Sequence, residues 1–294
     1  MTPRDPLVAI EGVRRACRAV DGHDPVDESV HLRLKHHGLA DTSAWVETDG
    51  FALRRGTALD LAVAPEARGH GLGGRLAAAA AADPGELTAW AHGDHPAARV
   101  IADRLGFARA RELWVMRRPS VVPLPAAEPP AGVTIRDFGM TDAEALLAVN
   151  AAAFAAHPEQ GSMSADDLAE RMAEPWFDPA GLLLAVGPDG DLLGFHWTKR
   201  HDADHGEVYI IGIPPAAHGR GLGKALTVAG LRHLASRGVA EVHLYVESDN
   251  EPALRLYSGL GFDHAAADTH VQYHRPSHGS QPSHETPSPG YDRP

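Results

Sequence analysis

Apolar residues along the first 118 positions alternate between helical and strand spacing. From Leu7 to Val20 they recur every three or four positions, which predicts an amphipathic helix. The pattern then predicts strands across 43–63, a helix over 69–82 that opens with glycines, and a second helix over 95–105. Strands and helices mixed in this order are typical of an α/β unit.

The second half has the same succession. A strand is predicted from Val133, and Thr141-Asp-Ala-Glu144 predicts a capping box for a helix running through Phe154. Further strands are predicted at 182–186, 192–198, 207–213 and 240–246, and helices at 221–237 and 251–259. We therefore expect an α/β (α+β) protein of two tandem domains, each a mixed β-sheet flanked by helices.

Two proline-bearing stretches set the expected domain boundaries. Residues 119–131 contain five prolines and predict a linker, which leaves domains at 1–118 and 132–275. The end of the chain, 276–294, is rich in Pro, Ser and His, and this composition predicts disorder.

Two short motifs occur once in each half and in the same order. Arg-Gly-His-Gly-Leu-Gly at 68–73 returns 150 residues later as His-Gly-Arg-Gly-Leu-Gly at 218–223. Leu-Gly-Phe stands at 105–107 and again at 260–262. Paired motifs about one domain apart indicate a duplicated fold.

The glycine motif predicts a site for phosphate or pyrophosphate. Each copy follows an apolar strand and opens a helix, so several backbone N–H groups and the helix dipole point at one place. The spacing is neither that of a P-loop, since Gly-Lys-Ser/Thr is absent, nor that of the dinucleotide fingerprint. A structural turn is the alternative for one copy alone, and the duplication favours the ligand site.

Charge and composition limit the classes of molecule that the protein is expected to bind. The net charge of −12 disfavours nucleic acid and suits a cationic or neutral polar small molecule. The single cysteine, Cys17, excludes an intrachain disulfide and fits a reducing compartment, and a buried helical position is its expected role. The chain has no signal-peptide pattern at its start and no apolar run of membrane-spanning length. We expect a soluble, cytoplasmic monomer that binds neither nucleic acid nor membrane.

The strand followed by Gln/Arg-x-x-Gly-x-Gly/Ala resembles the acetyl-CoA motif of the GNAT N-acetyltransferases, with His218 as a departure from the usual Gln or Arg. The resemblance implies that the loop binds pyrophosphate and that the preceding strand splays from its neighbour to hold the pantetheine and thioester. In the second half, the stretches at 157–161, 194–199, 207–212 and 244–250 resemble a tandem branch of this family from actinobacteria. That branch acetylates the cysteinyl amine of a cysteinyl-glucosaminyl-inositol.

The resemblance assigns acetyl-CoA, as co-substrate, to both glycine loops. In the second half the implied contacts are Ile211, Gly212, Ile213, His218, Gly219, Arg220, Gly221, Leu222, Gly223, Lys224, Asn250, Glu251, Pro252, Ala253, Leu254 and Arg255. In the first half they are Leu61, Ala62, Val63, Gly69, His70, Gly71, Leu72, Gly73 and Gly74.

Acetylation of an amine needs a general base and an acid for the leaving thiolate. Glu207, on the strand that leads to the second loop, is the candidate base, and with period 2 it should share a face with Tyr209 and Ile211. Tyr257, just before Leu-Gly-Phe, occupies the position of the family's acid. The alternatives are a solvated charge for Glu207 and core packing for Tyr257.

Spacing from the two motifs places Thr57 and Ala102 opposite these two residues in the first half. The first domain therefore lacks both side chains. We expect it to bind acetyl-CoA or to have a structural role, without catalysing transfer.

The acceptor implied by the resemblance is a small-molecule amine rich in hydroxyls. Its candidate contacts are Glu28, Glu159, Lys199, Glu207 and Tyr245. Two alternatives stay open: a tandem acetyltransferase acting on another small amine, and a non-catalytic regulator that binds acetyl-CoA.

The 19 histidines raise the possibility of a metal site. His201 and His205 are four residues apart, as are His270, His274 and His278. The first pair lies in a predicted loop and the second set runs into the predicted tail, where no rigid site is expected. The sequence therefore predicts no metal.

Overall fold

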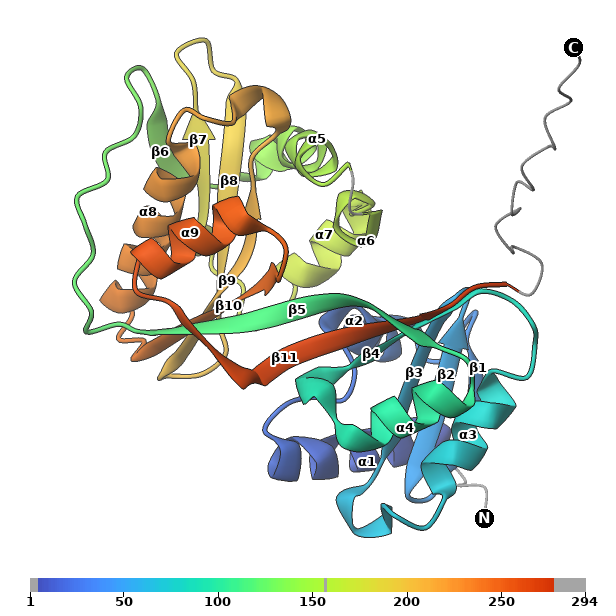
Figure 1. Ribbon diagram of the computed structural model, residues 1–294. Coiled ribbons are helices and arrows are strands. Elements are labelled where there is room, and N and C mark those ends of the chain that lie inside the picture. The colour runs from blue at the N-terminus through green and yellow to red at the C-terminus, as the bar shows by residue number, and fades with distance from the viewer. Residues whose placement is uncertain (1–4, 156–157, 278–294) are drawn as a thin grey trace, which may run out of the picture. The chain divides into compact units, whose positions relative to one another are not determined.

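The computed structural model describes residues 5–155 and 158–277, without the side chains of residues 158 and 159. The chain divides into two compact units (Figure 1). Unit 1 comprises Met1–Arg111 and Val271–Pro294, and unit 2 comprises Glu112–His270. Among the described residues, no helix has the length and apolar character needed to cross a membrane.

Unit 1 is a sheet with helices on both faces. Its elements are α1 (Pro6–Asp21), α2 (Glu28–His37), β1 (Ser43–Glu47), β2 (Gly50–Arg55), β3 (Ala58–Val63), α3 (Leu72–Ala80), β4 (Leu87–Ala91) and α4 (Pro96–Arg104). The strand order is β1-β2-β3-β4, followed by the end of β11 (Asp263–Arg275). Neighbours are antiparallel except β3 and β4.

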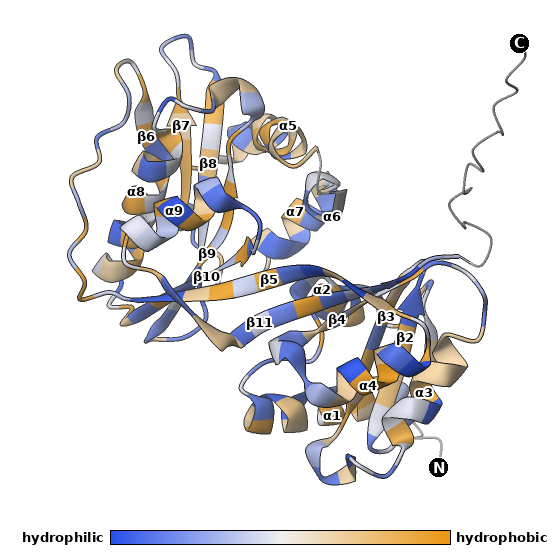
Figure 2. Ribbon diagram, viewed as in Figure 1, coloured by the Kyte–Doolittle hydropathy of each residue, from blue (hydrophilic) through white to orange (hydrophobic). Residues whose placement is uncertain are grey.

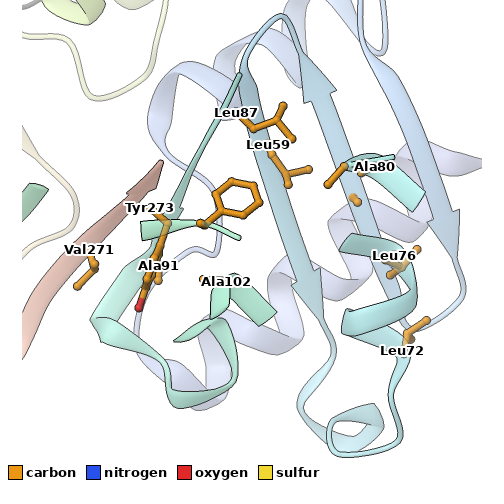
Figure 3. Close-up of a cluster of buried hydrophobic side chains, with 12 residues drawn as sticks. Leu59, Leu72, Leu76, Ala80, Leu87, Ala91, Ala102, Val271 and Tyr273 are labelled. Carbon is orange, nitrogen blue, oxygen red and sulfur yellow. The ribbon is translucent and has the colours of Figure 1, made fainter. Parts of the chain in front are cut away.

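Two apolar clusters fill unit 1. Ile10 and Cys17 of α1 pack with Phe51 on one face, which confirms a buried helical position for Cys17. On the other face, residues of α3 and α4 pack against β3 and β4, and Val271 and Tyr273 join them from the C-terminal strand (Figure 3). The core of unit 1 therefore contains residues from both ends of the chain.

Unit 2 has the same plan with additional elements. They are β6 (Thr134–Asp137), α5 (Ala143–Ala153), α6 (Pro158–Gly161), α7 (Ala165–Met172), β7 (Leu182–Val186), β8 (Leu192–Arg200), β9 (His205–Gly212), α8 (Leu222–Ser236), β10 (Glu241–Glu247) and α9 (Glu251–Gly259). The strand order is β5 (Ala108–Pro119), then β10-β9-β8-β7-β6, and only β9 and β10 run parallel. Every residue of β7 is apolar, as the colour of its ribbon in Figure 2 shows. Residues of α5 and α7 pack on one face of the sheet, and those of α8 and α9 pack on the other.

The last strand of each repeat belongs to the other unit. Residues 113–119 of β5, which follows the first Leu-Gly-Phe, pair with β10 of unit 2. Residues 271–275 of β11, which follows the second Leu-Gly-Phe, pair with β4 of unit 1. The expected boundaries at 118 and 275 thus differ from the structural division, because neither chain segment folds onto its own half.

The expected linker is packed on unit 2. Ser120 N donates to Ala240 O at 2.7 Å, and Leu124 and Ala127 pack against the cluster beneath β10. The buried guanidinium of Arg118 donates to the backbone oxygens of Leu260, at 2.7 Å, and Val122. Residues 119–131 therefore do not form a free tether.

Most predicted elements are confirmed to within a few residues, including α1, β1 to β3, α8 and α9. The predicted capping box is wrong: Asp142 Oδ2 accepts the backbone N–H of Gly139 at 2.9 Å, so the cap begins two residues before Thr141. The tail predicted to be disordered lies almost entirely outside the described residues.

Candidate active site

The second glycine loop presents an open helix N-terminus. Gly219 and Gly221 adopt φ of +74° and +80°, values that favour glycine, and a Cβ on either would meet no atom within 4 Å. Gly221 is the N-cap of α8 and uses no side chain to cap it, so the first N–H groups of the helix stay available. Arg220 and Lys224 are exposed beside the loop. Backbone donors and nearby cations suit a pyrophosphate.

The side chain at the motif's first position braces the loop in both units. His218 Nε2 lies 2.8 Å from Ile213 O, and Arg68 Nε donates to Val63 O at 3.1 Å. Val63 and Ile213 are equivalent positions in the two repeats. The departure at His218 therefore preserves the bond that holds the strand end to the loop.

The parallel pair beside each loop separates toward its end. In unit 2, β9 and β10 pair from His205 with Glu241 to Val208 with Leu244, and the last four residues of β9 have no partner on β10. In unit 1 the single pair between β3 and β4 is Ala58 with Thr88. Separated strands next to a glycine loop leave a backbone edge for a ligand, as the family resemblance implied.

A bulge in β9 changes which face each side chain occupies. Ile210 pairs with Trp197 and Val208 with Thr198, so Tyr209 is the extra residue of the bulge. Tyr209 and Ile210 pack on the α5 face, whereas Ile211 packs on the α8 face. The expectation that Glu207, Tyr209 and Ile211 share one face is therefore wrong for Ile211, because strict period 2 assumes an unbroken ladder.

Glu207 lies in a row of polar residues across three strands. It pairs in register with Lys199 of β8 and with His243 of β10. His201, just after β8, reaches its carboxylate: the distance from His201 Nε2 to Glu207 Oε2 is 2.7 Å, and that from His243 Nε2 is 3.7 Å. We call these four residues the Glu207 cluster.

The charge of Glu207 is balanced by this cluster. Its side chain is 8% exposed, and burial alone would raise the carboxyl pKa. The hydrogen bond to His201 and the electrostatic interactions with His243 and Lys199 outweigh burial, and the pKa lies below its ordinary value. Burial lowers the pKa of His243. Glu207 is thus a buried carboxylate at neutral pH, and the solvated-charge alternative is wrong.

Lys199 is a buried cation held by aromatic rings. Its Nζ lies 4.7 Å from the ring centre of Trp176 and 5.1 Å from that of Tyr209. The Tyr209 hydroxyl accepts a hydrogen bond from Arg171 Nε at 2.9 Å. The bulged tyrosine is therefore fixed from α7 and in turn fixes the lysine beside Glu207.

The two candidate tyrosines have different surroundings. Tyr245 of β10 is 44% exposed, and its ring packs edge-on against His243 and His270. Tyr257 of α9 is buried with Val246 and Phe262, and burial raises its pKa to about 12. Tyr257 therefore contributes to the core and also remains protonated at any ordinary pH.

The remaining acceptor candidates are less well defined. Glu28 is the first residue of α2 in unit 1, half-buried, whereas the others belong to unit 2. Glu159 is in α6, and its side chain lies outside the described residues. The buried Asn150 donates to Gln160 O at 2.7 Å and ties this helix to α5.

The start of α9 resembles the start of α4 in unit 1. Asn250 caps α9 by accepting from Ala253 N at 3.2 Å, and His95 caps α4 by accepting from Ala97 N at the same distance. Arg255 pairs with Glu251 on the exposed surface of α9. The candidate acetyl-CoA contacts at 250–255 therefore include a cap and a solvent-facing ion pair.

The histidines of the cluster are the residues that sequence spacing missed. His205, four residues after His201, contacts Asp202 at 3.0 Å, whereas His201 contacts Glu207 and His243. His270 packs against Tyr245, and His274 contacts Glu86 in unit 1, while His278 lies outside the described residues. Register pairing across β9 and β10 was the signal needed, and it is not local in sequence.

The counterparts in unit 1 have no comparable chemistry. Thr57 is exposed in the turn before β3, and Ala102 of α4 is buried in the apolar cluster. Neither side chain can act as an acid or base at neutral pH.

The sequence of this chain matches both a family model and individual known proteins. The family model of the acetyltransferase (GNAT) family matches residues 147–262. A mycothiol acetyltransferase from a Nocardioides species is 57% identical over 92% of this chain and 98% of its own length. Another, from Actinosynnema mirum, is 50% identical over 92% of this chain and 96% of its own length.

Solved structures share the fold. A GCN5-related N-acetyltransferase from Sphaerobacter thermophilus has a TM-score of 0.66 at 23% identity, covering 94% of this chain and 96% of that one. A tandem GNAT protein from the clavulanic acid biosynthesis pathway has a TM-score of 0.69 at 18% identity, covering 96% and 98%. At these identities the likeness concerns the fold alone, and it extends over both units.

Proposed function

Because the chain belongs to the mycothiol acetyltransferase family, within the GNAT acetyltransferases, we propose that it performs the last step of mycothiol synthesis. In that step the acetyl group of acetyl-CoA passes to the cysteinyl amine of 1D-myo-inositol 2-(L-cysteinylamino)-2-deoxy-α-D-glucopyranoside. The amide C–N bond forms, the thioester C–S bond breaks, and CoA leaves as its thiol. The observation that carries the proposal is the buried, charge-balanced Glu207 beside the point where β9 and β10 separate.

Glu207 is proposed to take the proton of the acceptor ammonium. A buried carboxylate attracts a cationic amine and can accept its proton once nitrogen attacks. The His201 side chain is 37% exposed, against 8% for Glu207, and gives that proton a path to solvent. Lys199 and Tyr245, on the flanking strands, supply polar contacts to the hydroxyls of the acceptor, with Glu28 and Glu159 as the further candidates.

Acetyl-CoA is proposed to bind along the free edge of β9, with its pyrophosphate on Gly219 to Gly223. Backbone N–H groups of this edge would stabilise the oxyanion that forms on the thioester carbonyl. Tyr257, on the opposite face from Glu207, would protonate the leaving thiolate, since strands that separate leave the thioester accessible from both faces. The first loop, at 69–74, is proposed to bind acetyl-CoA without catalysis.

A steady-state assay tests the proposal. CoA release is followed with acetyl-CoA and the cysteinyl-glucosaminyl-inositol acceptor, for the wild type, Glu207→Gln and the unit 1 control Thr57→Val. We expect Glu207→Gln to lower kcat by roughly 10²- to 10⁴-fold and Thr57→Val to leave it unchanged, because a positioned base contributes about that much.

The pH profile sharpens the assignment. The pKa of Glu207 lies below its ordinary value, so the carboxylate is already ionised at the pH where an ordinary carboxyl group titrates. The acid limb of the kcat/KM profile should therefore report the pKa of the acceptor ammonium and not that of Glu207. Full turnover by Glu207→Gln would refute the base. Absence of turnover by the wild type with this acceptor would refute the substrate.

A further inference from the structure

The Glu207 cluster has a second chemical property besides basicity. His201, Glu207 and His243 each offer one ligand atom, and the three atoms all lie within 4.8 Å of one another. The two histidine nitrogens converge on the same carboxylate oxygen, from a loop and from β10. We propose that these three residues form a binding site for a divalent transition-metal ion of the Zn²⁺ type.

The geometry requires little movement to accept the ion. Around tetrahedral zinc, with bonds of about 2.0–2.2 Å, donor atoms are separated by roughly 3.3–3.5 Å. The distances from Glu207 Oε2 to the histidine nitrogens, 2.7 Å and 3.7 Å, lie on either side of that value. The rings of His201 and His243 are inclined by 30° with centres 5.1 Å apart, and the Nε2 atom of each is the one nearest to the carboxylate oxygen.

The donor set selects the class of ion. Two imidazoles and one carboxylate suit Zn²⁺ and its neighbours, whereas Mg²⁺ and Ca²⁺ prefer oxygen ligands. Three protein ligands leave the fourth position open to water or to a ligand. Lys199 bears a like charge near the site, but its Nζ is held over the rings of Trp176 and Tyr209.

Occupation of this site would inhibit acetyl transfer. An ion on Oε2 withdraws the lone pairs that would take the amine proton and places a positive charge where the ammonium must come. This consequence rests on the proposed role of Glu207, whereas the binding itself does not. The site would thus make acetyl transfer sensitive to free transition metal.

Calorimetric titration of chelator-treated full-length protein with ZnCl₂ tests the binding. The variants are His243→Asn, a second ligand variant His201→Asn, and the control His274→Asn, which alters another histidine–carboxylate contact, at Glu86. We expect both ligand variants to weaken Zn²⁺ binding by at least about tenfold. Removing a residue that only hydrogen-bonds a metal ligand already weakens metal affinity by about that factor, and removing the ligand itself should weaken it at least as much. His274→Asn should bind as the wild type does. Equal affinity in the wild type, His243→Asn and His201→Asn would overturn the site, and thermal unfolding curves verify that each variant is folded.

The inhibitory consequence is measured at buffered free Zn²⁺, since CoA and the acceptor both carry thiols that bind the ion. We expect wild-type turnover to fall with free Zn²⁺, and the turnover of His243→Asn, taken relative to its own zinc-free rate, to lose that sensitivity. Zinc binding without inhibition of an active enzyme would overturn the regulatory consequence. A protein that binds Zn²⁺ at these residues but transfers no acetyl group would support the site and refute the proposed function.

Discussion

Units 1 and 2 have the same strand, glycine loop and helix but differ on the face opposite that helix. In unit 2 the strand before the loop carries Glu207, flanked in register by Lys199 and His243. In unit 1 the turn before that strand carries an exposed threonine, Thr57. Duplication has therefore kept the glycine loop in both copies, whereas the proposed base and acid are present in one. A ligand loop depends on backbone conformation, whereas a base depends on a few side chains.

After Glu207→Gln, the largest effect that separates the units is expected at Tyr257. Replacement by Phe keeps the packing against Phe262 but removes the proposed thiolate acid, so kcat should fall by roughly 100-fold. Tyr273→Phe, in the apolar cluster of unit 1, is the matched control and should leave kcat unchanged. Rates between pH 6 and 10 provide a second check: burial raises the pKa of Tyr257 to about 12, so its ionisation should not appear in this range. Undiminished kcat in Tyr257→Phe would assign the residue to the core alone.

An intermediate effect is expected at the two loops. Gly221 and Gly71 have φ of +80° and +81°, and a Cβ there meets open space, so Ala costs backbone strain of about 1–2 kcal/mol in either unit. We expect Gly221→Ala to raise the KM for acetyl-CoA about tenfold, which corresponds to about 1.4 kcal/mol.

Gly71→Ala should leave the kinetic constants unchanged and weaken acetyl-CoA binding to unit 1 in an equilibrium titration. The reverse pattern, with Gly71→Ala impairing turnover, would show that the first loop serves catalysis.

The smallest effect is expected at Arg68 and His218, whose side chains hold the end of the strand to the loop. Arg68→Ala should destabilise the protein by about 1 kcal/mol more than His218→Ala, because Arg68 also donates to Asp21 at 2.6 Å in a charge-assisted bond. The hydrogen bond from Arg68 lowers the pKa of Asp21. The contribution of this pair to the free energy of unfolding is therefore present when the pH is above the ordinary carboxyl pKa, and it is lost as the pH falls through the lowered pKa.

Urea unfolding of both variants at pH 7 and pH 3 measures this difference, which should shrink at the lower pH. A difference independent of pH would attribute the Arg68 effect to packing.

Local sequence was sufficient for much of the fold. The spacing of apolar residues located α1, β1 to β3, α8 and α9, because each element shows its own period over consecutive residues. The glycine motifs located the two helix N-termini, because a left-handed turn favours glycine whatever lies around it. The same reasoning failed at Ile211, because the bulge at Tyr209 reverses the alternation, and the ladder that produces the bulge involves β8.

The sequence by itself determined that the protein is a duplicated α/β acetyltransferase with a glycine loop in each half, and it identified Glu207 and Tyr257 as candidates in one of them. The tertiary structure decided the exchange of β5 and β11 between the units, the packing of the proline-rich stretch, and the partners of Glu207. His201 and His243 lie 42 residues apart and meet at one carboxylate because β9 and β10 pair in a particular register. Such pairing depends on which strands lie side by side, which residues far apart in the sequence determine together.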